Sequence, residues 1–414
     1  MHHLRRIAIC VLIFLLLVPA SPAQAAETTD ANLTAGWLAR TLASNNDLAV
    51  TPTGDIDYAS TAYSLVGLRA AGVAGDQISA SAQAMAQSGE AFIGAPDQAD
   101  SKTTAIALMI LAMVAGDLDP SHYVGSTGTR DLYADLEAVI QPDGAVSTMA
   151  TAYGQSFAIL ALLSAPDGVP DTVTSWLLAQ PCTDSSSPGF GGYGFSGPGS
   201  CDDTDPDSTA LAVIALAAAG TSTATLDNAR TYLVSVQDSS GGFASPFSGI
   251  NANTTGLSVA ALNAIFSGSP EASAGVRFLE SLMYGCDYTT DPVTPGLAGA
   301  MALTSDSRST TPVSPLSDSD RAVFFQASAQ GIYGFVDIVT SPGEYKAAST
   351  AVPDPDCLSA SSGSSALSGP SPSPAPAGTS DSSAANDWWW ALGGFLVVVL
   401  TYLGWRFIIS ARKA

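Results

Sequence analysis

A nine-residue pattern of small, hydroxyl and aliphatic residues recurs along the chain and constrains the fold more than any other feature. Successive copies are separated by roughly 45 to 50 residues, a spacing typical of helical repeat architectures. Each copy begins with small or hydroxyl residues and continues as an Ala/Leu-rich stretch that is apolar nearly all round, as expected for a helix buried on every side. The copies occupy residues 60–68, 103–111, 154–162, 208–216 and 254–262, with a weaker one around 321–330.

Amphipathic helices are expected between these copies. Residues 171–180 and 227–237 each carry one apolar face and end in turns rich in Gly, Pro or Asn. A repeated alternation of polar-faced outer helices and apolar inner helices predicts an all-α fold. It favours an α/α toroid of about six outer/inner helix pairs over residues 26–357, although an open solenoid has the same pattern.

Short polar side chains stand three positions before the copies. The third copy has Thr151 there, and the other copies have Asp57, Asp100, Asp205 and Asn251. These residues fit helix N-caps, whose side-chain oxygens accept hydrogen bonds from first-turn N–H groups, worth about 1 kcal/mol each. Because they recur at one end of each inner helix, we also expect them, together with Asp207, to line one mouth of the barrel and to contact a ligand there.

The stretch YLVSVQDSSGGFASP at 232–246, followed by NANTTGLSVAAL, carries a family resemblance. It resembles the repeat shared by prenyltransferase β subunits, squalene-hopene cyclases and the cobalamin carriers intrinsic factor and transcobalamin. The resemblance implies an α6/α6 toroid with a central cavity, and 141–146 and 189–195 look like degenerate copies. In the sharp copy we expect Gly241 and Gly242 to make the outer-to-inner turn, Phe243 to pack beneath it, and Gln237 to bond to nearby backbone.

Each activity of this superfamily implies a residue set. Prenyltransferases hold zinc with Asp, Cys and His, but His122 lies far from any cysteine, so we expect no metal and no cofactor. Cyclases protonate an alkene with the middle Asp of a DxDDTA motif. Here DPDSTA places Asp207 at the acid's position and Ser208 where the next carboxylate would stand. The inner repeats are also poor in aromatics, apart from Tyr63 and Phe157.

A glycan-active α/α-barrel enzyme would need paired carboxylates in a cleft. The glutamates considered for this role are expected on outer helices or loops, and they are Glu90, Glu137, Glu271, Glu280 and Glu344. The acidic string at 202–207 could supply such a pair. It could also bind Ca²⁺, although it lacks the glycine and terminal glutamate of an EF-hand loop.

The carrier branch remains, since cobalamin carriers are secreted, disulfide-bonded and bind without covalent chemistry. There is no room here for their β-rich second domain. We therefore predict a binding or adaptor protein in preference to an enzyme. It would capture a small molecule such as cobalamin, or a partner protein such as a membrane transporter, at the barrel mouth. A purely structural surface protein also fits. The net charge of −23 disfavours nucleic acid, because phosphate binding needs a basic face.

The N-terminal residues 1–25 have the layout of a secretory signal peptide. Arg5 and Arg6 precede an apolar run, and small residues end the segment at Ala25. A retained membrane anchor is the alternative, but about a dozen apolar residues are too few to span ~30 Å of hydrocarbon. The mature chain is therefore expected to start outside the membrane.

The C-terminal part predicts a tether. Residues 358–387 are rich in Ser, Pro and Ala and are expected to form a disordered stalk. Residues 388–409 begin with an uncharged apolar run and predict one transmembrane helix, with 410–414 as a basic cytoplasmic tail. A buried core helix is the alternative for this run. We expect a single-pass cell-membrane protein whose N-terminal domain is extracellular.

Four cysteines remain after the leader, an even number that predicts two disulfides in an oxidising compartment. Three pairings can be drawn. We favour Cys182 with Cys201, closing a Gly-rich loop, and Cys286 with Cys357. Zinc binding is the rival interpretation, but no histidine lies near these cysteines.

Overall fold

The computed structural model describes residues 22–126, 128–194, 199–286, 296–338 and 347–354. In this part the chain is mostly helical with a few short strands, which confirms the all-α class. Most of the predicted signal peptide, and the predicted stalk, transmembrane helix and tail, lie outside the described residues. Within them, no helix is both long and apolar enough to cross a bilayer.

Two sets of helices alternate along the chain. The six repeat copies lie on inner helices, as predicted, and these are α2 (Tyr58–Ala71), α5 (Ala99–Ala115), α7 (Ala152–Leu162), α9 (Pro206–Ala218), α11 (Ala252–Ile265) and α14 (Asp318–Gly331). The outer helices are α1 (Pro22–Ser44), α3 (Gly75–Ser88), α6 (Leu132–Glu137), α8 (Asp171–Leu178), α10 (Asp227–Val236) and α12 (Pro270–Leu282). Each outer helix packs against one or two inner helices.

Short elements occupy the connections. They are the helices α4 (Glu90–Ile93) and α13 (Ser305–Thr310), the 3₁₀ turns η1 (Pro96–Gln98), η2 (Pro120–His122) and η4 (Ile332–Gly334), and the strands β1 (Tyr123–Gly125), β2 (Gly128–Arg130), β3 (Phe243–Ser245) and β4 (Gly249–Asn251). The strands form two antiparallel hairpins, β1–β2 and β3–β4. The second hairpin connects the outer helix α10 to the inner helix α11.

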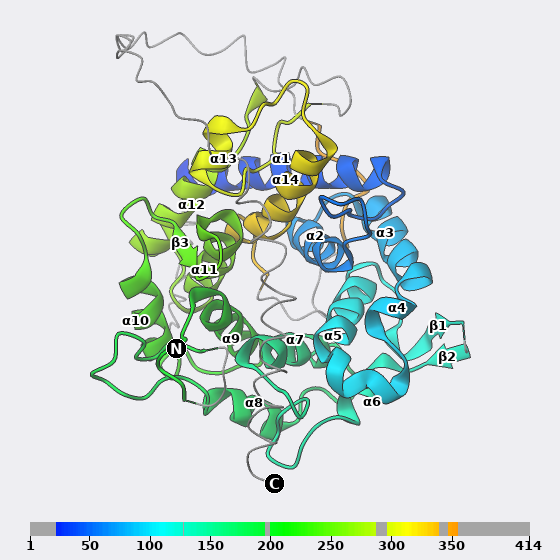
Figure 1. Ribbon diagram of the computed structural model, residues 1–414, viewed down its shortest axis with the longest axis vertical. Helices are drawn as coiled ribbons and strands as arrows, with labels where there is room; N and C mark the ends of the chain where they lie inside the picture. The colour runs from blue at the N-terminus through cyan, green and yellow to red at the C-terminus, as the bar shows by residue number, and fades with distance from the viewer. Residues whose placement is uncertain (1–21, 127, 195–198, 287–295, 339–346, 355–414) are drawn as a thin grey trace, which may run out of the picture.

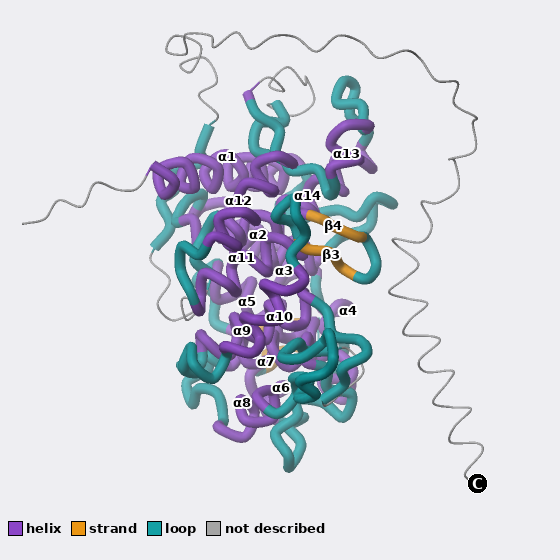
Figure 2. The backbone as a smooth tube through the Cα atoms, turned by 90° about the vertical axis from the view of Figure 1, so that its left-hand side faces the viewer, coloured by secondary structure: helices purple, strands orange, loops and turns teal. Residues whose placement is uncertain are grey.

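The inner helices contact one another in chain order, and the last returns to the first. Helix α2 packs on α5, α5 on α7, α7 on α9, α9 on α11, α11 on α14, and α14 on α2. Figure 1 shows these helices arranged around a centre, and Figure 2 shows the same helices from the side, with β3, β4 and α13 at one edge. Two long-range bonds support the closing contact: Gln326 Nε2 donates to Asp57 Oδ2 (2.9 Å), and Tyr333 Oη donates to the Tyr63 carbonyl (2.8 Å).

A buried side chain near the start of the inner helices accepts the backbone N–H of the preceding turn. The pairs are Ala49 N with Thr61 Oγ1 (3.0 Å), Val146 N with Gln155 Oε1 (2.8 Å), Tyr193 N with Thr209 Oγ1 (2.9 Å), Phe243 N with Thr255 Oγ1 (3.0 Å) and, further along its helix, Met301 N with Ser328 Oγ (2.8 Å). Buried N–H groups need such partners. This requirement explains why the repeat copies begin with hydroxyl or amide residues.

The predicted role of the Gln-Gly-Gly-Phe motif is confirmed. Gly241 has a left-handed φ of +91°, and an added Cβ would lie 2.3 Å from the carbonyl oxygen of Ala274. Gln237 Nε2 donates to the carbonyls of Gly241 (2.8 Å) and Glu271 (2.9 Å), and Phe243 is fully buried. The turn therefore fixes α11 to the next outer helix, α12. Three other glycines occupy equivalent positions: Gly144, Gly191 and Gly299. Gly144 and Gly191 pack against the backbone of the outer helix that follows, and Gly299 packs against the backbone of α1.

Candidate functional site

Most of the predicted helix caps are confirmed. The side chains of Asp57, Thr151, Asp205 and Asn251 each accept a hydrogen bond from the backbone N–H three residues later. The prediction for Asp100 is wrong, because α5 begins earlier than expected, at Ala99, directly after η1. Asp100 is thus inside the first turn, and its Oδ1 accepts the N–H of Thr148 (2.7 Å), in the loop before α7.

The predicted ligand residues lie at the N-termini of the inner helices. Contacts between neighbouring N-termini divide these residues into separate groups. Asp207, at the start of α9, is hydrogen-bonded to Thr254, at the start of α11 and three residues after Asn251. Asp57 is held by Gln326 of α14, and Asp100 by Thr148. The structure therefore joins Asp205, Asp207 and Asn251 in one region and leaves Asp57 and Asp100 with partners of their own.

Four side chains from three inner helices form what we call the inner cluster: Tyr63, Tyr153, Phe157 and Asp207. The hydroxyls of Tyr63 and Tyr153 lie 3.0 Å apart. The Phe157 ring lies 5.1 Å from the Tyr153 ring, edge to face, and 5.9 Å from the Tyr63 ring. Helices α2 and α7 are not neighbours in the ring, so this contact crosses the inside. Asp207 acts electrostatically on both tyrosines, and Asp57 also acts on Tyr63.

The inner cluster is protected from bulk solvent but not sealed. Tyr63, Tyr153 and Asp207 keep partly exposed surface although they lie on inner helices, whereas Phe157 is buried. Burial raises the pKa of Tyr63 to about 12 and that of Tyr153 well above its ordinary value. Both hydroxyls therefore stay protonated and can act as hydrogen-bond donors.

The two carboxyls at the start of α9 have the most unusual chemistry of the site. Burial and, to a smaller extent, the neighbouring Asp205 raise the pKa of Asp207 to about 7, while the bond to Thr254 opposes the shift. Burial likewise raises the pKa of Asp205 to about 6, against the hydrogen bond from the Ser208 N–H. Asp205 Oδ2 and Asp207 Oδ1 are enclosed and accept no hydrogen bond from the described residues. Enclosed acceptors of this kind are unusual and point to a site of function.

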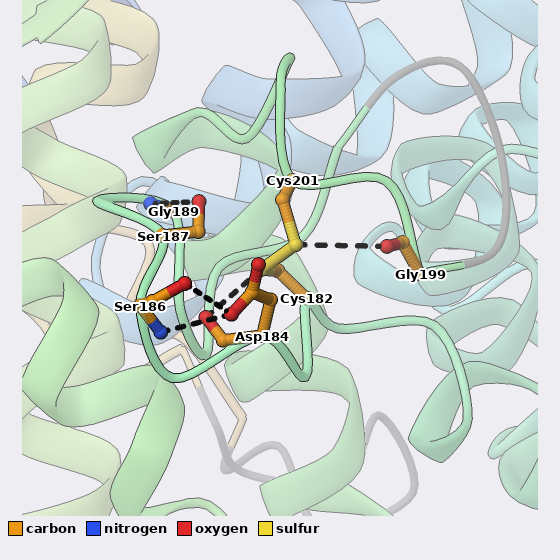
Figure 3. The surroundings of a disulfide bond; sticks show 7 residues. All are labelled: Cys182, Asp184, Ser186, Ser187, Gly189, Gly199 and Cys201. Carbon is orange, nitrogen blue, oxygen red and sulfur yellow. Dashed lines mark hydrogen bonds between the residues drawn. A yellow bond between two sulfur atoms is a disulfide. The ribbon is translucent and has the colours of Figure 1, made fainter.

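The predicted disulfide between Cys182 and Cys201 is confirmed and shapes the approach to α9 (Figure 3). Its two cysteines tie the ends of the Gly-rich loop, and Cys182 also exchanges backbone bonds with Gly191 and Gly192. The Asp205 N–H then donates to the Tyr193 carbonyl (3.1 Å). Cys286 is also disulfide-bonded, and its expected partner Cys357 lies outside the described residues.

The other acidic candidates lie away from the inside of the ring. Glu90 accepts bonds from Ser126 in the β1–β2 turn, while Glu137 belongs to α6, and Glu271 and Glu280 belong to α12. Glu344 lies outside the described residues. Within the described ranges, no group of three or more His, Cys, Asp or Glu side chains is arranged to hold a metal ion.

Sequence reasoning missed two members of the site. Tyr153 directly precedes the third repeat copy, and its aromatic character was the available signal. Tyr333 follows α14 in η4 and bonds to the Tyr63 carbonyl, but nothing in its local sequence indicates this contact. A surface pocket of about 260 Å³ between α1 and α14, lined by Thr41, Arg321 and Phe325 among others, was not predicted either.

Comparison with protein-family models and with curated proteins finds no match for this chain. The resemblance to the prenyltransferase and cyclase repeat therefore rests on the chain's own motifs and stays a hypothesis.

Proposed function

We propose that this chain is an extracellular binding protein, held on a cell membrane by its C-terminal segment, that takes up a small molecule against the inner cluster. One observation carries the proposal: Asp207 has an enclosed oxygen without a partner in the described structure, and its carboxyl acts electrostatically on Tyr63 and Tyr153 of the inner cluster. A polar group kept in this state costs stability, and a ligand that bonds to it recovers that cost.

The proposal assigns the fold to the α/α toroids. The alternation of inner and outer helices, the contact of α14 with α2, and the glycine turn at Gly241 support this assignment. In the proposed class, ligands enter at the ends of the inner helices, where the capping residues lie. Cobalamin is one candidate ligand that the resemblance suggests.

The proposed location rests on three features of the chain. Residues 1–25 have signal-peptide layout, residues 388–409 have the length and apolarity of a membrane span, and the Cys182–Cys201 disulfide suits an oxidising compartment. The domain would then stand outside the cell on the stalk of residues 358–387.

The residue set counts against a terpenoid cyclase-like reaction. A pKa of about 7 keeps Asp207 protonated below neutral pH, as a general acid requires, but Ser208 stands where the motif's next carboxylate would lie. The inner helices also offer few aromatic rings to stabilise a cationic intermediate. The described glutamates give no support to a glycan-active enzyme, because they belong to outer helices and loops, so such an enzyme would have to use Asp205 and Asp207. Binding requires no proton transfer and so fits the site better.

A second candidate, a docking platform for a partner protein, is favoured by one observation. Three of the exposed large apolar side chains stand in turns that lead into inner helices: Ile56 before α2, Met149 before α7 and Phe247 before α11. Large exposed apolar residues that gather on one side of a protein commonly mark interaction surfaces.

Thermal unfolding of the purified full-length chain, with disulfides intact, tests the binding proposal. The panel contains cobalamins, polyprenyl lipids, organic amines and oligosaccharides. Ligand at a hundredfold its Kd should add about 2.7 kcal/mol and raise Tm by several degrees. Asp207→Asn should remove the shift and Asp227→Asn, an exposed carboxylate on α10, should keep it. A shift that survives Asp207→Asn would place binding elsewhere, and no shift with any class would favour the docking platform.

A further inference from the structure

Among the residues that the structure describes, the acidic groups Asp205 and Asp207 have no basic partner. The inner helices have three basic side chains among the described residues, and each is directed elsewhere. Arg69 pairs with Asp117 (2.8 Å), Lys102 lies beside Gly94 at the end of the short helix α4, and Arg321 lines the pocket against α1. Helices α7, α9 and α11 contain no Lys or Arg at all.

The carboxyl of Asp207 meets only neutral or acidic groups. It is bonded to Thr254 of α11, its titratable neighbours are Asp205 on its own helix, Tyr63 on α2, Tyr153 on α7 and Tyr232 on the outer helix α10, and none of them is basic. An enclosed carboxylate in such surroundings either takes up a proton or requires a cation from outside. Asp205 is fully buried and its Oδ2 has no partner among the described residues, so its carboxyl has the same need for a proton or a cation.

The aromatic rings of the inner cluster have the chemistry that the apolar part of such a cation requires. Tyr63, Tyr153 and Phe157 come from two helices and present ring faces and edges to one another at 5.1 and 5.9 Å. Aromatic faces attract cations, most strongly where water is excluded. A carboxylate beside clustered aromatic rings is the combination that recognises an ammonium group attached to an apolar body.

We infer that the ligand of this site is an organic cation, whose ammonium group pairs with Asp207 and whose apolar part packs against Tyr63, Tyr153 and Phe157. The inference rests on the binding function proposed above and names the chemical class of its ligand. A quaternary or primary amine satisfies both the enclosed carboxylate and the aromatic rings. A neutral alcohol of the same shape satisfies only the rings.

Isothermal titration of the full-length chain with matched pairs of probes separates these alternatives. The first pair is choline and its neutral isostere 3,3-dimethyl-1-butanol, and the second is phenethylamine and 2-phenylethanol. We expect each cation to bind at least about tenfold more tightly than its isostere at pH 8. Choline keeps its charge at every pH, so a weaker preference at pH 5.5 would report protonation of the protein's own carboxyl.

The variants locate the effect. Asp207→Asn should abolish the preference for the cation, and Asp227→Asn should leave it unchanged. Equal affinity for cation and isostere overturns the inference, and so does a preference that survives Asp207→Asn. The proposed binding function still stands in either case if another class of ligand binds in a way that depends on Asp207. If no class raises Tm, the proposed binding function fails as well, so the two failures are distinguished.

Discussion

The hydroxyl oxygens of Tyr63 and Tyr153 lie 3.0 Å apart, although α2 and α7 are separated in the ring by α5. We expect this contact to couple the two helices energetically. A double-mutant cycle with Tyr63→Phe and Tyr153→Phe, followed by chemical denaturation, should give a coupling of about 0.5–1.5 kcal/mol. Additive effects would show that the two hydroxyls are satisfied by water instead of by each other.

The glycine turn should be sensitive to a single methyl group. Gly241→Ala forces a side chain into a left-handed backbone and places its Cβ 2.3 Å from the Ala274 carbonyl oxygen, so we expect a loss of about 2–4 kcal/mol. Gly220→Ala is the matched control, since Gly220 also has positive φ (+84°) but an added Cβ meets nothing within 4 Å. Similar losses in both, measured by urea denaturation, would mean that backbone strain alone matters.

The bond from the turn to the inner helix makes a second stability prediction. Thr255→Val keeps the shape of the side chain but leaves the buried Phe243 N–H without an acceptor, which should cost about 1–3 kcal/mol. Thr231→Val, on the exposed face of α10, removes a hydroxyl that bonds only to its own helix and should cost less than about 0.5 kcal/mol. The two Tm values, measured side by side, check this difference.

Much of this architecture could be predicted because its signals are local. The apolar repeats identified the inner helices, and four caps were correct because a cap depends on residues within one turn. Asp100 was misplaced because η1 starts α5 earlier than the pattern indicates. Gly299 was missed since the segment around it lacks the Gln and Phe that mark the turn at Gly241.

The inner cluster could be predicted only in part. Asp207 was identified from the DPDSTA string, but its raised pKa depends on burial and on Asp205, which a linear pattern does not reveal. The meeting of Tyr63 with Tyr153 depends on how far α2 and α7 approach across the ring. That approach is set by the packing of every inner helix, so no single segment encodes it.

The acidity of the site should appear in the pH dependence of stability. The pKa of Asp207 in the folded chain is about 7, above the ordinary 3.8, so ionisation is more costly in the folded state. The stability that the protonated group provides is therefore fully present below about pH 4 and lost as pH rises through about 7. Asp207→Asn, which cannot ionise, should gain stability relative to wild type as the pH rises above about 4, reaching on the order of 1–3 kcal/mol at pH 8.

Thermal unfolding of both proteins at pH 4.5, 6 and 8 provides the measurement. Asp227→Asn serves as the exposed control and should show no comparable gain at pH 8. A constant offset between wild type and Asp207→Asn across the three pH values would contradict a raised pKa at this position.

The contact of α14 with α2 also bears on how the chain is made. Ribosomes deliver α1 and α2 first, yet these helices obtain their last neighbours only when α14 has emerged, more than 240 residues later. An open array of repeats can fold pair by pair as it is synthesised, whereas in this chain the apolar flank of α2 stays exposed until synthesis is nearly finished. Folding of this protein in the cell should therefore depend on holdase chaperones that bind α2 during that interval.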